Sequence, residues 1–188
     1  MRFFRLWLFF AGVLATVFLG WAALVGVPGL QLAAVPPQAG LRPYTYEQAH
    51  GREVYVREGC LYCHSQQTRA EGFGADQKRL WGRPSVPGDY VYDQPHLLGT
   101  SRTGPDLLNI GARQPSREWH LSHLYNPRAV VPKSVMPPFP WLFEETTSPP
   151  PGEVALPLRP GLWAVPTREG HDLVEYLLGL NHTYPVKP

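Results

Sequence analysis

Cys60-Leu61-Tyr62-Cys63-His64 is the stretch that decides how this chain folds. Two thiols separated by two residues, with a histidine directly after the second, form the attachment motif of a c-type haem. Each thiol adds to one haem vinyl group, and the histidine then lies under the iron as its proximal ligand. The motif therefore predicts one covalently bound haem c, held by Cys60, Cys63 and His64.

Two other uses of paired cysteines agree less well with this sequence. A redox-active Cys-x-x-Cys usually lies near a βαβ pattern, and no such pattern surrounds Cys60. A structural zinc site usually recruits further thiols or histidines at set spacings, whereas the chain contains only two cysteines. With both thiols committed to a haem, no disulfide is expected.

The composition points to a folded, loop-rich domain and argues against nucleic acid as a partner. The chain has 188 residues, a formal net charge of +2, 22 prolines and 18 glycines. It contains no basic run of the kind that binds nucleic acid. Because aromatic residues make up 12% of the chain, the many prolines and glycines indicate ordered loops and not disorder.

The N-terminal part predicts a membrane anchor. Residues Leu6 to Val27 carry no charge, and as a helix they would extend about 33 Å, enough to cross a bilayer. Arg2 and Arg5 precede this run, which places the N-terminus in the cytoplasm and the rest of the chain outside. The alternative is a cleaved signal peptide, but its apolar region would be shorter.

Three segments follow from this pattern: an anchor at 1–27, a spacer at 28–43 and a haem domain at 44–188. The spacer contains Pro28, Pro36, Pro37, Gly40 and Pro43. Prolines at this density favour an extended, fairly stiff tether.

The predicted haem domain is mainly α-helical with long irregular loops. Thr45 and Gln48 form a capping box for a helix over 46–57, in which Gly51 and Tyr55 share a face. An apolar stripe predicts a last helix over 168–180. A first helix with a glycine and an aromatic residue, crossing a last helix rich in Leu and Tyr, resembles the helix pair of class I cytochromes c.

Between these helices the chain is expected to be mostly irregular. The segment 69–99 has no clean periodicity and is predicted to be an ordered loop with a functional or interface role. Ser116 is expected to cap a short helix that reaches Tyr125 and stops at Pro127. The segment 144–166 is expected to be a second proline-rich excursion without regular structure.

Met136 is the expected second axial ligand of the iron. Apart from Met1 it is the only methionine, and two prolines follow it. Thioether ligation raises the reduction potential, which suits electron transfer. The alternative is a methionine that fills a gap in the core. Histidine could also supply the ligand, from His50, His96, His120, His123, His171 or His182. His120 and His123 are three residues apart on the short helix, a spacing that could hold a metal ion, but a partner-facing or surface role is expected for them.

Several further motifs resemble one known family. They are Tyr55-x-Arg57-Glu58-Gly59 before the haem motif and Ser65-Gln66 directly after it, Arg102-Thr103-Gly104-Pro105-Asp106-Leu107, Trp119-His120, Leu124-Tyr125-Asn126-Pro127-Arg128, Val131-Pro132-x-Ser134-x-Met136-Pro137 and Pro140-Trp141-Leu142. This ordered set resembles the mono-haem cytochrome c subunit (CcoO/FixO type) of cbb3-type cytochrome c oxidases. The resemblance extends over about half of the chain.

The resemblance implies roles for residues and partners. Cys60 and Cys63 would hold the haem between His64 and Met136, with the carbonyl of Pro105 orienting His64. Arg102, Arg113 and Arg128 become candidates for the haem propionates or for a neighbouring subunit, with solvated surface charges as the alternative. The chain would relay electrons, without being the catalyst, to a large haem-copper subunit in a bacterial inner membrane. Its donor would be a further cytochrome c subunit or a soluble cytochrome c.

The chain departs from the family pattern at three places. Gln67-Thr68-Arg69 follows the haem motif where the family commonly has Met, a hydrophobic residue and Arg. Gln94 stands where a histidine before proline is usual, and the stretch 146–166 has no counterpart. Two alternatives for the whole chain remain: the cytochrome c subunit of a nitric oxide reductase, and a free-standing membrane-tethered cytochrome c.

Overall fold

The computed structural model describes residues 2–185, with side chains described from residue 4. The chain divides into two compact units, Met1–Pro37 and Gln38–Pro188. The side chain of Arg2, on which the predicted orientation partly rests, lies outside the described part of the chain. So do residues 186–188 at the end of the predicted haem domain.

The first unit is one continuous helical rod. It comprises α1 (Arg2–Trp21), a π-helical turn (Ala22–Gly26) and α2 (Val27–Ala33). The stretch Phe4–Ala33 is long and apolar enough to cross a membrane, and none of the residues in its most hydrophobic part is buried within the protein. The unit is thus a single N-terminal apolar helix and a candidate membrane span.

The helix continues past the point where the sequence predicted an extended spacer. The prediction of extended chain from residue 28 is wrong as far as Ala33, because α2 contains Pro28 in its first turn. Proline lacks a backbone N–H, but the first turn of a helix does not need one. The π-helical turn just before it shifts the hydrogen-bond pattern locally, which is a known way for apolar helices to accommodate proline.

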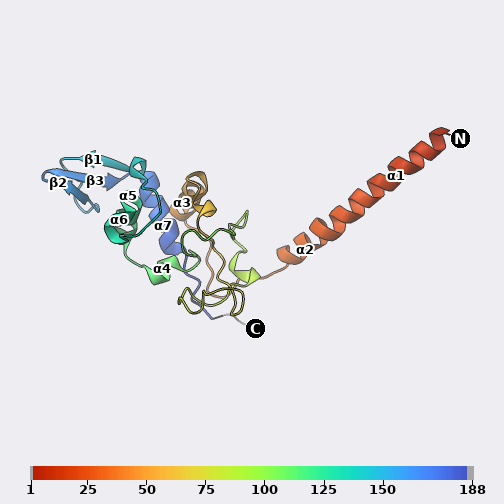
Figure 1. The fold of residues 1–188 in the computed structure, drawn as a ribbon, viewed down its shortest axis with the longest axis horizontal. Coiled ribbons are helices and arrows are strands. Elements are labelled where there is room, and N and C mark those ends of the chain that lie inside the picture. Colours follow the sequence, from red (N-terminus) through yellow and green to blue (C-terminus); the bar gives the residue numbers. More distant parts are fainter. Residues whose placement is uncertain (1, 186–188) are drawn as a thin grey trace. The chain divides into compact units, whose positions relative to one another are not determined.

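The second unit is built around the crossing of α3 (Tyr46–Arg57) and α7 (Arg168–Gly179), which Figure 1 shows side by side. The capping box of Thr45 and Gln48 is present, as the sequence predicted. At the crossing, a β-carbon on Gly51 would lie 1.9 Å from the carbonyl oxygen of Asp172. Only glycine therefore permits this approach of the two helices.

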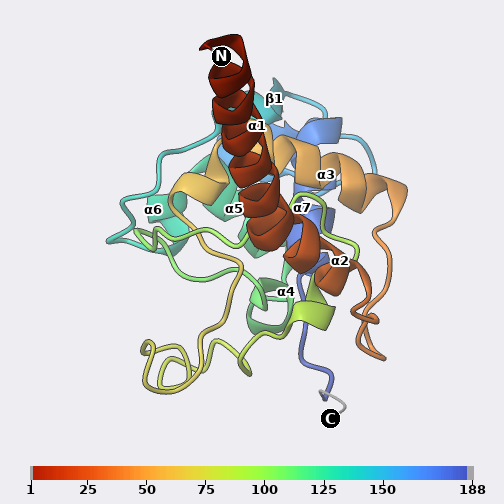
Figure 2. The same ribbon diagram turned by 90° about the vertical axis from the view of Figure 1, so that its right-hand side faces the viewer.

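The remaining helices and turns of the second unit are short. They are the 3₁₀ turns η2 (Cys60–Tyr62), η3 (Pro87–Asp89) and η4 (Pro140–Leu142), and the helices α4 (Ile110–Arg113), α5 (Arg117–Tyr125) and α6 (Pro127–Val130). Helix α5 confirms the prediction of a short helix capped by Ser116. The segment 69–99 is irregular apart from η3, also as predicted (Figure 2).

A small antiparallel sheet replaces the second irregular excursion that the sequence predicted. Its strands are β1 (Phe143–Thr146), β2 (Leu156–Arg159) and β3 (Leu162–Pro166), in the order β1-β3-β2 (Figure 1). The prediction of no regular structure over 144–166 is therefore wrong. The strands have four or five residues and contain two prolines, so periodicity could not reveal them. The dipeptide Pro160-Gly161 was the available turn signal, and Gly161 has a φ of 76°.

The core of the second unit lies around the crossing of α3 and α7, with side chains from α5 and η4 packed against these helices. The ring of Tyr176 in α7 is fully buried and meets Tyr55 and Tyr44 edge-on, with ring centroids 5.5 Å and 5.6 Å apart. Leu121 and Leu142 are also fully buried in the same cluster, with half-buried Met136 packed against it. The second unit is therefore mainly helical with a small sheet. Its packing places segments that are distant in the sequence next to Cys60–His64.

Candidate haem site

The haem motif leaves the end of α3 in a tight turn. Gly59 has a φ of 73°, which lets the chain turn sharply after α3 and enter η2. The backbone N–H groups of Cys63 and His64 then both donate to the carbonyl oxygen of Cys60, at 3.1 Å and 3.0 Å. Both thiols are free, with Cys60 half-buried and Cys63 exposed. Burial, followed by the charge of Glu58, raises the pKa of Cys60 to about 12, so its thiol is neutral before any attachment.

The imidazole of His64 is held in one tautomer by Pro105. Its Nδ1 lies 2.8 Å from the carbonyl oxygen of Pro105. A carbonyl can only accept, so Nδ1 carries the proton and Nε2 keeps its lone pair. Burial lowers the pKa of His64 and favours this neutral ring, although the hydrogen bond to Pro105 opposes that effect. His64 is therefore prepared to act as a ligand through Nε2.

The segment before Pro105 fits closely against the ring of His64. A β-carbon on Gly104 would lie 2.2 Å from Cε1 of His64, so any other residue would displace the ring. Backbone hydrogen bonds hold the two segments in register. Gly104 N–H donates to the oxygen of Cys63 at 2.9 Å, and Leu107 N–H donates to the oxygen of Ser65 at 2.7 Å. The Gly-Pro-Asp-Leu run thus backs the haem motif directly.

Two buried nitrogens near His64 have no hydrogen-bond partner among the described residues: Nε of Arg113 and Nδ1 of His123. Both groups interact electrostatically with His64. Burial lowers the pKa of Arg113, and it lowers that of His123 to about 4, so the imidazole is neutral at neutral pH. Buried polar groups without partners are rare in folded proteins. The carboxylates of a haem would supply acceptors for them, so the residues present fit a haem.

Met136 lies in the segment between α6 and η4. Its side chain is half-buried against the hydrophobic core, and its N–H donates to Oγ of Ser134 at 3.2 Å. A backbone hydrogen bond from Phe139 N–H to the oxygen of Leu124, at 2.9 Å, ties the segment to α5. A loop restrained in this way can hold a weak thioether ligand.

Comparison with protein families identifies the chain. The family model described as "Cytochrome C oxidase, mono-heme subunit/FixO" matches residues 5–150. The chain belongs to this FixO family. A comparison with curated proteins found no match. The matched region contains the apolar helix, the haem motif, the Gly-Pro-Asp-Leu run and Met136. Helix α7, which packs on α3, lies beyond it.

Membership confirms the resemblance inferred from the motifs and implies one haem in this FixO-family subunit. Among residues 2–185 the structure contains no cluster of three or more His, Cys, Asp or Glu side chains suited to a metal ion. Several alternative histidine ligands have other contacts. His50 lies 2.7 Å from Asp172, and His120 and His182 lie 2.8 Å and 2.9 Å from backbone carbonyl oxygens. His123 differs from them, because its Nδ1 has no hydrogen-bond partner in the described part of the chain.

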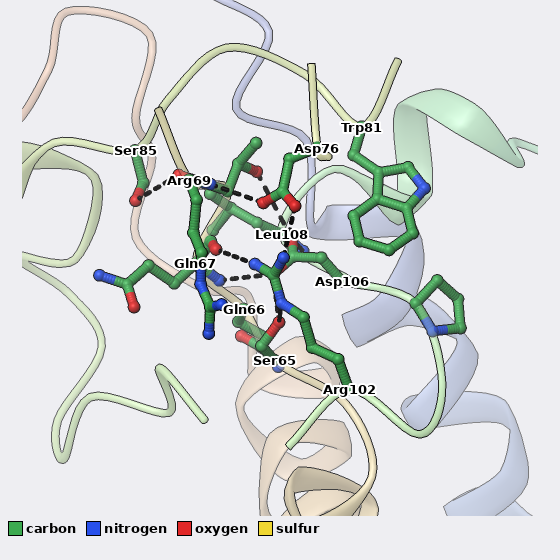
Figure 3. Close-up of polar contacts among 12 residues, drawn as sticks. Ser65, Gln66, Gln67, Arg69, Asp76, Trp81, Ser85, Arg102, Asp106 and Leu108 are labelled. Atoms are coloured by element: carbon green, nitrogen blue, oxygen red, sulfur yellow. Dashed lines mark hydrogen bonds and ion pairs between the residues drawn. The ribbon is translucent and has the colours of Figure 1, made fainter. Parts of the chain in front are cut away.

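The three candidate arginines have different surroundings. Arg113 lies with its guanidinium 5.7 Å from the centre of the Trp81 ring and donates to the backbone oxygen of Asp106. Arg128 is exposed in α6. Arg102 is surrounded by acceptors of this chain, as Figure 3 shows. Of the three, Arg113 combines partial burial, nearness to His64 and a nitrogen that has no hydrogen-bond partner within residues 2–185.

A group of buried polar residues lies beside the haem motif, and the sequence did not predict that they are buried together. They are Ser65, Gln66, Thr68, Asp76, Asp106 and Asn109, each at most 2% exposed. Asp106 was visible within the Gly-Pro-Asp-Leu run. Its connection to Asp76 could not be predicted, since a long irregular loop brings Asp76 into place.

Proposed function

We propose that this chain is the electron-transfer subunit of a membrane-bound cbb3-type cytochrome c oxidase and is not itself the oxygen-reducing catalyst. The proposal includes one haem c, attached through Cys60 and Cys63 and ligated by His64 and Met136. When bound, such a haem supplies a one-electron couple between Fe(II) and Fe(III). The observation that carries the proposal is the hydrogen bond from His64 to Pro105, next to the Cys60 and Cys63 pair, within a chain of the FixO family.

The residues of this chain would set the position and the potential of the haem. Pro105 orients the ring of His64, and a neutral His64 would offer Nε2 to the iron of a bound haem. Met136 would close the sixth position with a thioether, which raises the potential relative to a second histidine. Arg113 and His123 are the proposed partners of the propionates, since each has a buried nitrogen without a partner among the described residues. Arg128, exposed in α6, is proposed to face a neighbouring subunit, whereas Arg102 is occupied within the chain.

The domain is proposed to be a class I cytochrome c-like fold over residues 44–188, carried by a helical anchor that reaches Ala33 and by a short spacer between Ala33 and the domain. Support comes from the glycine-mediated crossing of α3 and α7 and from the apolar helix Phe4–Ala33. The proposed location is a bacterial inner membrane, with the N-terminus in the cytoplasm and the haem domain on the periplasmic side. The proposed partners are a large haem-copper subunit as acceptor and another cytochrome c as donor.

The experiment that tests this function uses the complex that co-purifies with the chain from native membranes in mild detergent. Reduced cytochrome c is supplied, and oxygen uptake and nitric oxide uptake are recorded side by side. Rapid oxygen uptake with little loss of nitric oxide is the expected result. The reverse would assign the chain to a nitric oxide reductase, and a monodisperse chain without partners or uptake would identify a free-standing carrier.

A further inference from the structure

Behind the proximal histidine lies a buried ionic network that the proposed function does not use. It consists of Asp106, Arg102, Asp76 and Ser65, and we call it the Arg102 network (Figure 3). Asp106 is fully buried and Asp76 is 1% exposed. Burying charged groups costs several kcal/mol per ion, so such a network is a weak source of stability and requires another explanation.

The carboxylate of Asp106 connects the two segments that make the hydrogen bond between His64 and Pro105. Its Oδ2 accepts from Ser65 Oγ at 2.6 Å and from Gln67 N–H at 2.8 Å. Ser65 follows His64 directly in the chain, and Asp106 follows Pro105 directly. One buried side chain therefore fixes the distance between the donor and the acceptor of that hydrogen bond.

Arg102 binds the Asp106 carboxylate and also the residues that this carboxylate contacts. Its Nε donates to Ser65 Oγ at 2.8 Å, one terminal nitrogen donates to the oxygen of Gln67 at 2.6 Å, and the other pairs with Asp76. The same terminal nitrogen that reaches Gln67 lies 3.4 Å from Oδ2 of Asp106. A guanidinium can reach all these acceptors at once because its donors form a rigid planar fork.

Asp76 anchors the network to the long loop. Its second carboxylate oxygen accepts from Arg69 N–H at 2.7 Å. Burial alone would raise the pKa of Asp76, but the hydrogen bonds from Arg102 and Arg69 outweigh it, so the carboxylate stays ionised. The guanidinium of Arg102 thus contacts two buried carboxylates, those of Asp76 and Asp106, and both of these carboxylates also bind the segment that follows His64.

We propose that the Arg102 network is a positioning device for the proximal histidine: it holds the Pro105 carbonyl against Nδ1 of His64 and thereby tunes the reduction potential of the haem. A firm hydrogen bond makes an imidazole a stronger donor to its metal. A stronger donor stabilises Fe(III) and lowers the potential, so loosening the network raises it. This inference rests on the proposed function, because it requires a haem on Cys60 and Cys63.

The test uses Arg102→Lys in the full-length, haem-loaded chain in detergent. Lysine keeps the positive charge but, as a compact point charge, cannot span the same acceptors. Two quantities are measured: the reduction potential by redox titration, and the exchange rate of the His64 Nδ1 proton by NMR after ¹⁵N-histidine labelling. We expect roughly a tenfold shift of the redox equilibrium toward Fe(II), equal to about 59 mV for one electron. We also expect proton exchange that is at least about tenfold faster.

Two further variants complete the test. Arg159→Lys changes an exposed arginine in β2 and is expected to alter neither quantity. Ser65→Ala removes the hydroxyl that bonds to Asp106 and Arg102 without changing any charge. If Arg102→Lys accumulates no haem-loaded protein, the potential and the proton-exchange rate of Ser65→Ala decide whether the network positions His64. Smaller shifts in the same direction are expected for it, since the contact between Arg102 and Asp76 remains.

An unchanged potential and an unchanged exchange rate would overturn the inference, even if stability fell, because the network would then only anchor the loop. Equal shifts in Arg159→Lys would overturn it as well. Failure of the proposed function is distinguishable: the wild-type chain would carry no covalent haem when tested by haem staining of a denaturing gel. That result would remove both proposals, whereas a haem-loaded wild type with unaffected variants would remove only this one.

Discussion

Replacing Gly51 by alanine tests the helix crossing on which the haem site is built. In the structure a β-carbon at this position would lie 1.9 Å from the oxygen of Asp172, 2.4 Å from its carbonyl carbon and 2.9 Å from the nitrogen of Leu173. All three are backbone atoms of α7, so no side-chain rotation can relieve the clash. The two helices would have to separate, and they carry Tyr55 and Tyr176, which are almost completely buried.

The size of the effect is a balance of two terms. Overpacking a core usually costs about 1–3 kcal/mol, and a contact between backbones belongs at the upper end of that range. Alanine in a helix is favoured over glycine by about 1 kcal/mol. The net loss is therefore about 2 kcal/mol or more, which lowers the Tm of a domain of this size by about 4–8 °C.

The assay is thermal unfolding of the full-length chain in detergent, followed by circular dichroism. Ala49→Gly is the matched control, because Ala49 is exposed in the same helix and its replacement measures the propensity difference alone. The free energy of unfolding of that control is expected to fall by about 1 kcal/mol. A Tm for Gly51→Ala equal to or above that of the wild type would refute the reasoning, since propensity would then outweigh the contact.

Three further predictions follow from single contacts. Met136→Ala is expected to keep the covalent haem but to lose the weak far-red thioether band and to lower the reduction potential; an unchanged ferric spectrum would remove Met136 from the ligand set. Gly104→Ala is expected to displace the ring of His64, because its β-carbon would lie 2.2 Å from Cε1; the absorption spectrum should show high-spin ferric haem, and a purely low-spin spectrum would contradict the prediction. Asp89→Asn is expected to destabilise by about 3 kcal/mol or more at pH 7, measured by urea unfolding, because it breaks a buried pair with Arg83. Burial opposes ionisation of Asp89, but hydrogen bonds led by Arg83 hold its pKa below the ordinary value. Its contribution is thus complete above a pH of about 4 and is lost as the pH falls through the lowered pKa; a difference between wild type and variant that persists at lower pH would contradict this assignment.

Local signals in the sequence were sufficient to predict those helices whose ends are stabilised by contacts between neighbouring residues. The capping box at Thr45 and Gln48 involves residues three apart, and it marks the start of α3 as the structure has it. Ser116 likewise caps α5. The strands β1 and β3 escaped prediction because they pair residues such as Phe143 and Pro166, which no short window contains.

The sequence by itself determined the haem motif, because Cys60, Cys63 and His64 lie within five consecutive residues and their spacing matches the chemistry of attachment. It also determined the apolar helix, since length and composition alone decide whether a segment can cross a membrane. Only the tertiary structure decided which groups surround the motif. Asp76 and Asp106 approach the segment after His64 from two different stretches of irregular chain. Such contacts depend on how the loops close. The packing of the whole domain determines loop closure, and no periodic pattern in the sequence reveals it.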